Sequence, residues 1–264
     1  MMELKNSLKT IFGVLLSVFL IALTGCNSSN PAAVQKKQKS SNPDKTSWHK
    51  GFPESWWKEV QRDPAKYWEI LPQDAGYMEV ILSERNELRL LSNFTETPFV
   101  FHGVCYPTIE SFWQMMKFPE TTNDPRWSWT QAWPWTREQV AGMNGHGARA
   151  AGNFANTLME KNEANWATFE GQRFTLVSQT QDIHYNLILQ ALQEKIRQNP
   201  EVYEVLVKTK NLKLRPDHTI SEKSPKEWHS YQLWTDIRQS IAAKKFDTKT
   251  QENLSLRTCK AKEN

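Results

Sequence analysis

The chain has 264 residues, of which 39% are hydrophobic and 23% charged, and its formal net charge is +4. This length suits one domain of ordinary size with its own core. The charge is too slight to indicate duplex nucleic-acid binding, so nucleic acid is expected only as a modified substrate. The six histidines are scattered and neither a CxxC nor an HExxH spacing occurs. The sequence therefore predicts no metal site and no cofactor.

Residues 1–25 are predicted to be a bacterial lipoprotein signal peptide. Lys5 and Lys9 precede an apolar run over residues 11–23, which is shorter than the ~20 residues of a transmembrane span. Leu23-Thr24-Gly25-Cys26 then matches a lipobox. Two acyl chains at Cys26 tether a protein stably, because each buried CH₂ contributes ~0.8 kcal/mol. We expect a lipid anchor in the outer membrane or at the cell surface; an uncleaved anchor helix is the alternative.

The rest of the chain divides by composition. Residues 26–47 are Ser, Asn, Lys, Gln and Pro with little apolar content, which is typical of a flexible linker. Residues 48–77 form an aromatic-rich extension, expected to pack as short helices. A glycan-binding strip of Trp56, Trp57 and Trp68 is the functional alternative. The main domain is placed at 78–243, and residues 244–264 read as a polar, disordered tail.

Within the main domain, the pattern predicts an α+β fold that is predominantly helical and has a small sheet. Strands are expected at 78–82, 88–91 and 99–104, with a strand or turn at 166–171. Helices are expected at 108–118, 136–141, 146–161, 182–198 and 201–208, followed by a last helix that ends near 238.

The helix predicted at 108–118 is the main candidate for chemistry. Thr108 is suited to cap it, and the apolar face is Ile109, Phe112, Trp113 and Met116. Glu110, Gln114 and Lys117 form a second, polar stripe at i, i+4, i+7. The stripe either lines a pocket floor or is the solvated face of an ordinary amphipathic helix.

A longer pattern surrounds this helix. The run Leu90-Leu91-Ser92-Asn93-Phe94 is followed by a short strand with Gly103 at its turn, and then by Tyr106-Pro107-Thr108 and the motif E-x-x-x-Q-x-x-K-F from Glu110 to Phe118. These elements, in this order and spacing, resemble the NADAR family, also called the YbiA-like family. The resemblance covers about Met78 to Ser240. Family members cleave N-glycosidic bonds of ribose-linked nucleotide derivatives, including early riboflavin intermediates and ADP-ribosylated guanine.

The resemblance implies an N-glycosidase that needs no metal or redox cofactor. Glu110 is expected to stabilise the oxocarbenium-like ribose or to activate water, and Lys117 to attack the opened ribose as a Schiff-base nucleophile. Asn93 and Gln114 would orient the substrate, alongside Phe94 and Trp113. The expected partner is a nucleotide or an ADP-ribose-type small molecule.

The last motif departs from the family's common pattern, because its Gly-rich run is missing. Asp217 is the candidate partner acid or base, with His218 beside it, and Trp228 is a candidate stacking face; a capped turn at Asp217-His218 is an equal alternative. Between the motifs, the Trp-rich stretch 119–135 either packs as a lid or stacks on a ring, with Trp127 and Trp129 as the contacts. A phosphate contact by Gly145, Gly147 and Arg149 is less favoured than a plain turn.

Two other classes of function stay open. The substrates of the family are cytoplasmic, whereas this chain carries an export signal, so a catalytically silent, lipid-anchored module for a nucleotide, glycan or protein is the second hypothesis. A conventional glycosidase is the third, and it is disfavoured because no acidic pair is evident.

Overall fold

A computed structural model describes residues 47–129, 133–177 and 182–249, all of which belong to one compact unit, Asp44–Asn264. Cys26 and the predicted signal peptide lie outside the described residues. Among the residues described, no helix is long and apolar enough to cross a membrane.

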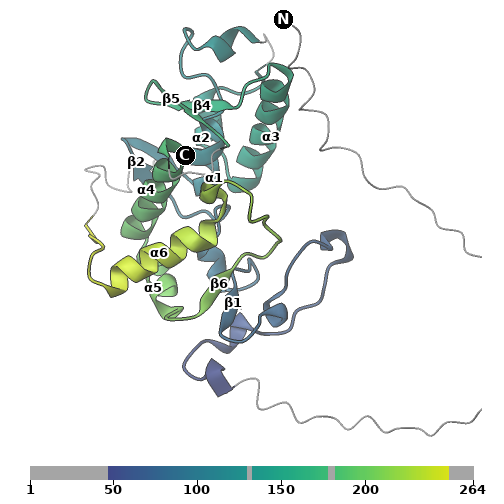
Figure 1. Cartoon of the computed structure of the whole chain (residues 1–264), viewed down its shortest axis with the longest axis vertical. Helices are drawn as coiled ribbons and strands as arrows, with labels where there is room; N and C mark the ends of the chain where they lie inside the picture. Colours follow the sequence, from purple (N-terminus) through teal and green to yellow (C-terminus); the bar gives the residue numbers. More distant parts are fainter. Residues whose placement is uncertain (1–46, 130–132, 178–181, 250–264) are drawn as a thin grey trace, which may run out of the picture. The chain divides into compact units, whose positions relative to one another are not determined.

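The fold is organised around a short helix, α1 (Ile109–Met115), that contacts three other helices. Its neighbours are α2 (Arg137–Ala141), α3 (Gly145–Lys161) and α4 (Ile183–Gln198), and Figure 1 shows α1 among them. Two further helices, α5 (Pro200–Lys208) and α6 (Ser230–Ala242), pack on α4 and on each other. Every residue of α1 is buried, so its polar side chains face protein rather than bulk water.

Among the residues that the structure describes, the strands form three separate two-stranded sheets. The first pairs β1 (Glu79–Ile81) in parallel with β6 (Lys213–Arg215), which joins the two ends of the domain sequence. The other two are antiparallel hairpins, β2 (Phe99–Phe101) with β3 (Val104–Tyr106) and β4 (Trp166–Phe169) with β5 (Gln172–Thr175). The predicted class, a predominantly helical α+β fold, is confirmed, but its strands are three isolated pairs.

Turn chemistry explains both hairpins. His102 and Gly103 have φ of 47° and 74°, and Glu170 and Gly171 have φ of 49° and 76°. Positive φ at both central residues is the requirement of a type I′ turn, the connection that matches the twist of two paired strands. The predicted strand 99–104 therefore ends at Phe101, and a second strand begins at Val104.

One predicted strand is wrong. Residues 88–91 belong to a 3₁₀ helix, Glu87–Leu91. The Asn86 side chain caps this helix by accepting the Leu88 backbone N–H at 2.9 Å. An apolar run this short does not separate strand from helix, and the cap decides.

The predicted helix starts are confirmed by their caps. Thr108 accepts the Ser111 N–H, Thr136 forms a capping box with Gln139, and Asp182 accepts the first N–H groups of α4. Helix α1 ends at Met115 rather than at Phe118. Lys117 and Phe118 continue it with N–H bonds to the carbonyls three residues back, at 3.2 and 2.9 Å, the tighter winding common in a last turn.

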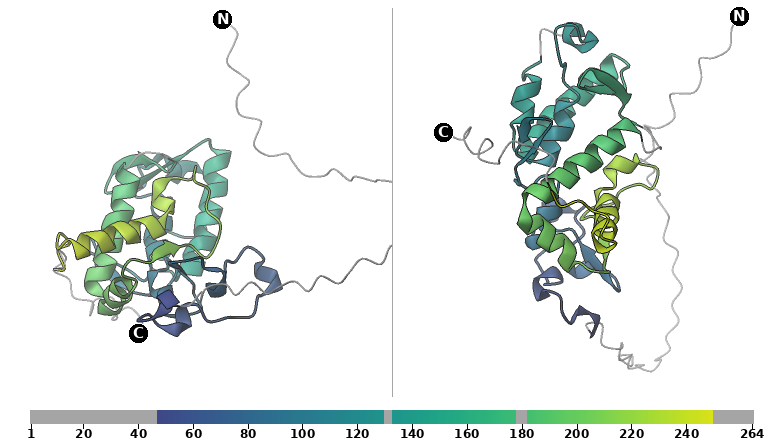
Figure 2. Two further views of the ribbon diagram at one scale, coloured as in Figure 1. Left: turned by 60° about the horizontal axis from the view of Figure 1, so that its bottom comes forward. Right: turned by 90° about the vertical axis from the view of Figure 1, so that its left-hand side faces the viewer.

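The N-terminal extension consists of short 3₁₀ helices: Ser47–His49, Glu54–Trp56, Pro64–Lys66 and Pro72–Asp74. Trp56 is fully buried in the core, and the Trp57 indole donates to the Glu79 carbonyl at 2.9 Å. In Figures 1 and 2 this purple-to-blue segment lies beside β1. A glycan-binding strip of Trp56, Trp57 and Trp68 is therefore wrong, since only Trp68 is well exposed.

Candidate active site

Helix α1 and the turn that follows it bury a row of three polar side chains. Glu110, Gln114 and Lys117 are 3%, 2% and 7% exposed. The Gln114 Nε2 donates to Glu110 Oε1 at 2.8 Å. The alternative of a solvated polar face is therefore excluded, because all three side chains are buried. Burial of two ionisable groups costs free energy.

Burial changes the proton affinity of both ionisable groups. It raises the pKa of the Glu110 carboxyl, and this outweighs the hydrogen bond from Gln114 and the charge of Arg149. Burial likewise lowers the pKa of Lys117 to about 8, against the attraction of Glu110. Each shift favours the neutral form of its group, the protonated carboxyl of Glu110 and the free amine of Lys117.

The Lys117 amine is buried without a partner among the residues that the structure describes. Its Nζ forms no hydrogen bond or ion pair with any described residue, although the side chain is almost completely buried. Arg149, on α3, is the charged group that contacts the carboxylate, with its Nη1 3.7 Å from Glu110 Oε1. A buried, unpaired lysine with a lowered pKa is typical of a nucleophilic amine.

Helix α3 packs on this row without a gap. A Cβ added at Gly152 would lie 1.8 Å from Gln114 Oε1, so glycine is needed at this crossing. The same oxygen is buried and accepts no hydrogen bond from any described residue. Close packing thus fixes the Gln114 amide so that its Nε2 points at Glu110.

The segment 92–94 forms the edge of the site. The Asn93 carbonyl accepts the Glu110 backbone N–H at 2.9 Å, and the Ser92 carbonyl accepts the buried Lys195 Nζ at 2.8 Å. The Asn93 Oδ1 is buried and accepts no hydrogen bond from any described residue. The Phe94 ring lies 5.3 Å from the ring of His146 at the start of α3. The structure thus brings Asn93 and Phe94 next to the row on α1.

Trp113 lies on a different side of α1. Its ring meets His184 edge-on at 5.4 Å, and His184 Nδ1 lies 2.9 Å from Glu227 Oε1, with both side chains fully buried. Trp228, the next residue, is 46% exposed. Trp113 is thus a core contact that links α1 to the segment carrying Trp228.

Asp217 and His218 follow β6 and bond to each other, with 2.7 Å between Oδ1 and Nδ1. The Asp217 carbonyl also accepts the Ile70 N–H at 2.7 Å. No contact between described residues joins either side chain to Glu110 or Lys117. Their catalytic and binding roles stay predictions.

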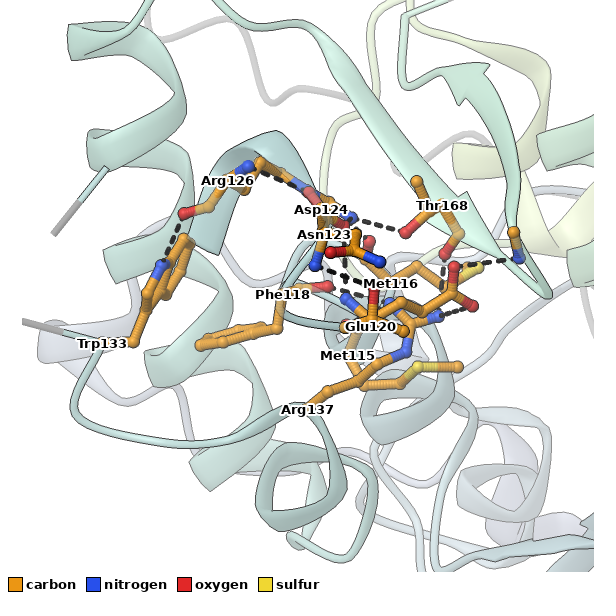
Figure 3. Close-up of polar contacts among 12 residues, drawn as sticks. Met115, Met116, Phe118, Glu120, Asn123, Asp124, Arg126, Trp133, Arg137 and Thr168 are labelled. Atoms are coloured by element: carbon orange, nitrogen blue, oxygen red, sulfur yellow. Dashed lines mark hydrogen bonds and ion pairs between the residues drawn. The ribbon is translucent and has the colours of Figure 1, made fainter. Parts of the chain in front are cut away.

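The Trp-rich stretch is held by a buried arginine (Figure 3). Arg126 is fully buried, forms an ion pair with Asp124 at 2.6 Å and donates to the Met116 carbonyl at 2.9 Å. The Trp133 indole donates to the Arg126 carbonyl at 3.0 Å. Trp129 is partly buried near Trp166, whereas Trp127 is 53% exposed.

Three neighbours of the site were not selected from the sequence as catalytic or binding groups. The sequence indicates Arg149 only as a contact for a phosphate and assigns no chemical role to His146 or Lys195. The burial of Lys195 could have been inferred from the sequence, because this residue lies on the apolar stripe of α4 beside Leu192 and Ile196. The hydrogen bond from Lys195 to the Ser92 carbonyl joins residues far apart in the sequence, so no local pattern predicts it. Among the described residues, no group of His, Cys, Asp and Glu could hold a metal ion.

The fold and the site define a predominantly helical α+β domain with a buried Glu–Gln–Lys row. No family model matches the chain, and no curated protein matches it. Among solved structures, the NMR structure of the E. coli protein YbiA is similar, with 17% identity and a TM-score of 0.41 over 71% of this chain and 96% of that chain. At this identity and TM-score the similarity identifies neither a family nor an activity.

Proposed function

We propose that the chain is an N-glycosidase that hydrolyses the N-glycosidic bond of a ribose-linked nucleotide derivative. The observation that supports this most is the unpaired, buried Lys117 amine beside Glu110, with the pKa of each group shifted toward its neutral form. The motif that resembles the NADAR family selects the same two residues. Substrates of that family, ADP-ribosylated guanine and riboflavin-pathway aminopyrimidine nucleotides, are the candidates.

Lys117 and Glu110 have different roles in the proposed reaction. The neutral Lys117 amine attacks the anomeric carbon, and the C–N bond breaks with its electron pair moving to the base. The Glu110 carboxyl gives its proton to the departing base and then takes one from the lysine nitrogen. The ribose adduct opens to a Schiff base on Lys117, and water hydrolyses it. The balance is one water consumed for one base and one free ribose end released.

The neighbouring groups are suited to hold the sugar. The Asn93 side-chain oxygen has no donor among the described residues, so a substrate hydroxyl or N–H group that displaces its cover could satisfy it, whereas the Gln114 amide acts by holding Glu110. Phe94 offers a ring face beside His146. Arg149, whose side chain is 56% exposed, is placed to meet a substrate phosphate.

The direct test is release of free base from ADP-ribosylated guanosine and from the aminopyrimidine nucleotide. Protein starting after Cys26 is compared with Glu110→Gln, Lys117→Ala and a control, Glu160→Gln, on the exposed side of α3. Wild type and control should release base, and both site variants should lose at least about a hundredfold in rate. Cyanoborohydride should trap a ribose adduct on wild type and none on Lys117→Ala.

A lipid-anchored binding module is the second candidate. The observations in its favour are the exposed rings of Trp127 and Trp228 and the lack of a contact between Asp217 and Glu110 among the described residues. Binding of either nucleotide without release, unaffected by Glu110→Gln and weakened by Trp228→Ala, would support the module against the enzyme.

We also propose that the domain acts in the cell envelope, tethered through Cys26. The support is the lipobox in the sequence. Palmitate labelling of the wild type in a bacterial host, lost in Cys26→Ala, is the expected result. Labelling that persists in Cys26→Ala would contradict the tether.

A further inference from the structure

A pocket of about 540 Å³ opens away from the proposed active site, and neither Glu110 nor Lys117 lines it. It lies between the β2–β3 hairpin, the turn of β4–β5 and helix α2, and Met115 lines it from α1. Its volume is in the range of small-molecule sites. The pocket and the Glu–Gln–Lys row therefore use different faces of the same helix.

The charge of the pocket is strongly acidic. Four carboxylates line it, from Glu96, Glu120, Glu138 and Glu170, together with Arg137 and His102, and the two basic groups pair with Glu120 and Glu170. Arg137 is not free to bind an anion, because it donates to the carbonyls of Met115, Phe118 and Thr168 and to Glu120 (Figure 3). Glu96 and Glu138 are exposed and form no ion pair with any described residue, so the pocket disfavours an anionic ligand.

The Tyr106 hydroxyl is a second, independent observation. Tyr106 is 3% exposed, lines the pocket, and its hydroxyl forms no hydrogen bond with any described residue. Burial raises the pKa of this phenol well above its ordinary value; the Arg137 charge opposes this shift, and the Glu170 and Glu120 carboxylates add to it. The hydroxyl therefore stays protonated where it lines the pocket. Because this hydroxyl lines the pocket and has no partner among the described residues, a ligand in the pocket can form a hydrogen bond with it.

Part of the pocket wall is apolar and aromatic. Met115 and Phe169 are buried and line it together with the Tyr106 ring. Aromatic faces attract cations when these are withdrawn from water. The Tyr106 and Phe169 rings thus favour a ligand with an aromatic body, and the exposed carboxylates of Glu96 and Glu138 favour a positive group on it.

We propose that this pocket is a second ligand site, which takes a small organic cation with a flat apolar body, of the amidine or aryl-amine class. The apolar body lies against Met115 and Phe169, and the cationic N–H groups reach the rim carboxylates. The Tyr106 hydroxyl accepts from or donates to the ligand. The site does not depend on the proposed glycosidase activity.

The probe is benzamidine, with benzamide as its neutral isostere. The full chain is purified in mild detergent with ¹³C-methyl methionine, and the Met115 signal is assigned with Met115→Leu. Met116 is fully buried and does not line the pocket, so it serves as the internal reference. Benzamidine should shift the Met115 methyl saturably with a Kd on the order of 1 mM, as small fragments do, and benzamide at least about tenfold more weakly.

Variants locate the binding. Tyr106→Phe, and Glu96→Gln combined with Glu138→Gln, should each weaken benzamidine at least about threefold. Glu160→Gln, which removes an exposed carboxylate outside the pocket, should leave it unchanged. The proposal is overturned if folded protein shows no Met115 shift at tens of millimolar. Equal binding of benzamide, or binding unchanged in both pocket variants, overturns it as well.

Discussion

The tight crossing of α3 over α1 makes a sharp prediction about Gly152. In the interior of a helix, replacing glycine by alanine ordinarily stabilises by ~1 kcal/mol. Here the new Cβ would lie 1.8 Å from Gln114 Oε1 and 2.3 Å from its Cδ. The side chain that holds Glu110 must then move. Overpacking of this kind costs ~1–3 kcal/mol, so Gly152→Ala should lower the free energy of unfolding despite its better helix propensity.

The cost comes from one side chain, and a double-mutant cycle can isolate it. In a Gln114→Ala background the Cβ has room, so Gly152→Ala should become neutral or stabilise by up to ~1 kcal/mol. The coupling between the two sites, which is the difference between these two effects, should therefore be ~1–4 kcal/mol. Gly142→Ala is the matched control, because its Cβ would meet nothing closer than 3.7 Å.

The measurement is urea unfolding of the four cycle proteins and the control, monitored by tryptophan fluorescence. For a domain of this size, 1 kcal/mol corresponds to a shift of ~2–4 °C in Tm, so calorimetry provides a second readout. If Gly152→Ala stabilises the wild type, or costs the same with Gln114 removed, the packing of α3 on the polar row is wrong.

Three further predictions follow from buried polar groups. Since burial lowers the pKa of Lys117 from 10.5 to about 8, the unfolded chain binds more protons between these values, and the free energy of unfolding should rise with pH from about 8 to 10.5. In Lys117→Met the total rise over this pH range should be smaller by up to about 3 kcal/mol, as measured by urea titrations at stepped pH. Equal rises in the two proteins would contradict the burial of the amine. Arg126→Met leaves the buried Asp124 unpaired and should lower the free energy of unfolding by ~3–5 kcal/mol in chemical denaturation. The control is Arg173→Met, which removes an exposed guanidinium that lies over the Trp166 ring and should cost under ~1 kcal/mol. Similar losses in the two variants would show that the ion pair is not the cause. Tyr106→Phe removes a hydroxyl without a partner among the described residues and should leave stability equal or slightly higher, and a loss above ~1 kcal/mol in the same assay would reveal a missing hydrogen bond.

Local chemistry explains which parts of the fold could be predicted from the sequence. Helix starts at Thr108, Thr136 and Asp182 follow from a side chain that satisfies N–H groups a few residues away, so a short window of sequence contains all the information. The spacing of Glu110, Gln114 and Lys117 likewise indicates that they share one side of a helix. Whether that side is buried is not a local property, and here the packing of α3 through Gly152 decided it.

A short apolar run does not distinguish a strand from a 3₁₀ helix, and a pairing between distant strands has no local pattern. Residues 88–91 carry as much apolar character as a strand, and only the Asn86 cap selects the 3₁₀ helix. The pairing of β1 with β6 joins residues more than a hundred positions apart, and no periodicity in either segment encodes it.

By itself, the sequence determined the class of fold, the positions of the main helices and the residues of the polar row, because each depends on contacts within a few residues. Only the tertiary structure decided that the row is buried, that Lys117 has no partner among the described residues, and that Arg137 is occupied by backbone carbonyls at a separate pocket. These properties depend on which distant elements exclude water from a side chain, and desolvation is what sets the charge and the reactivity of such groups.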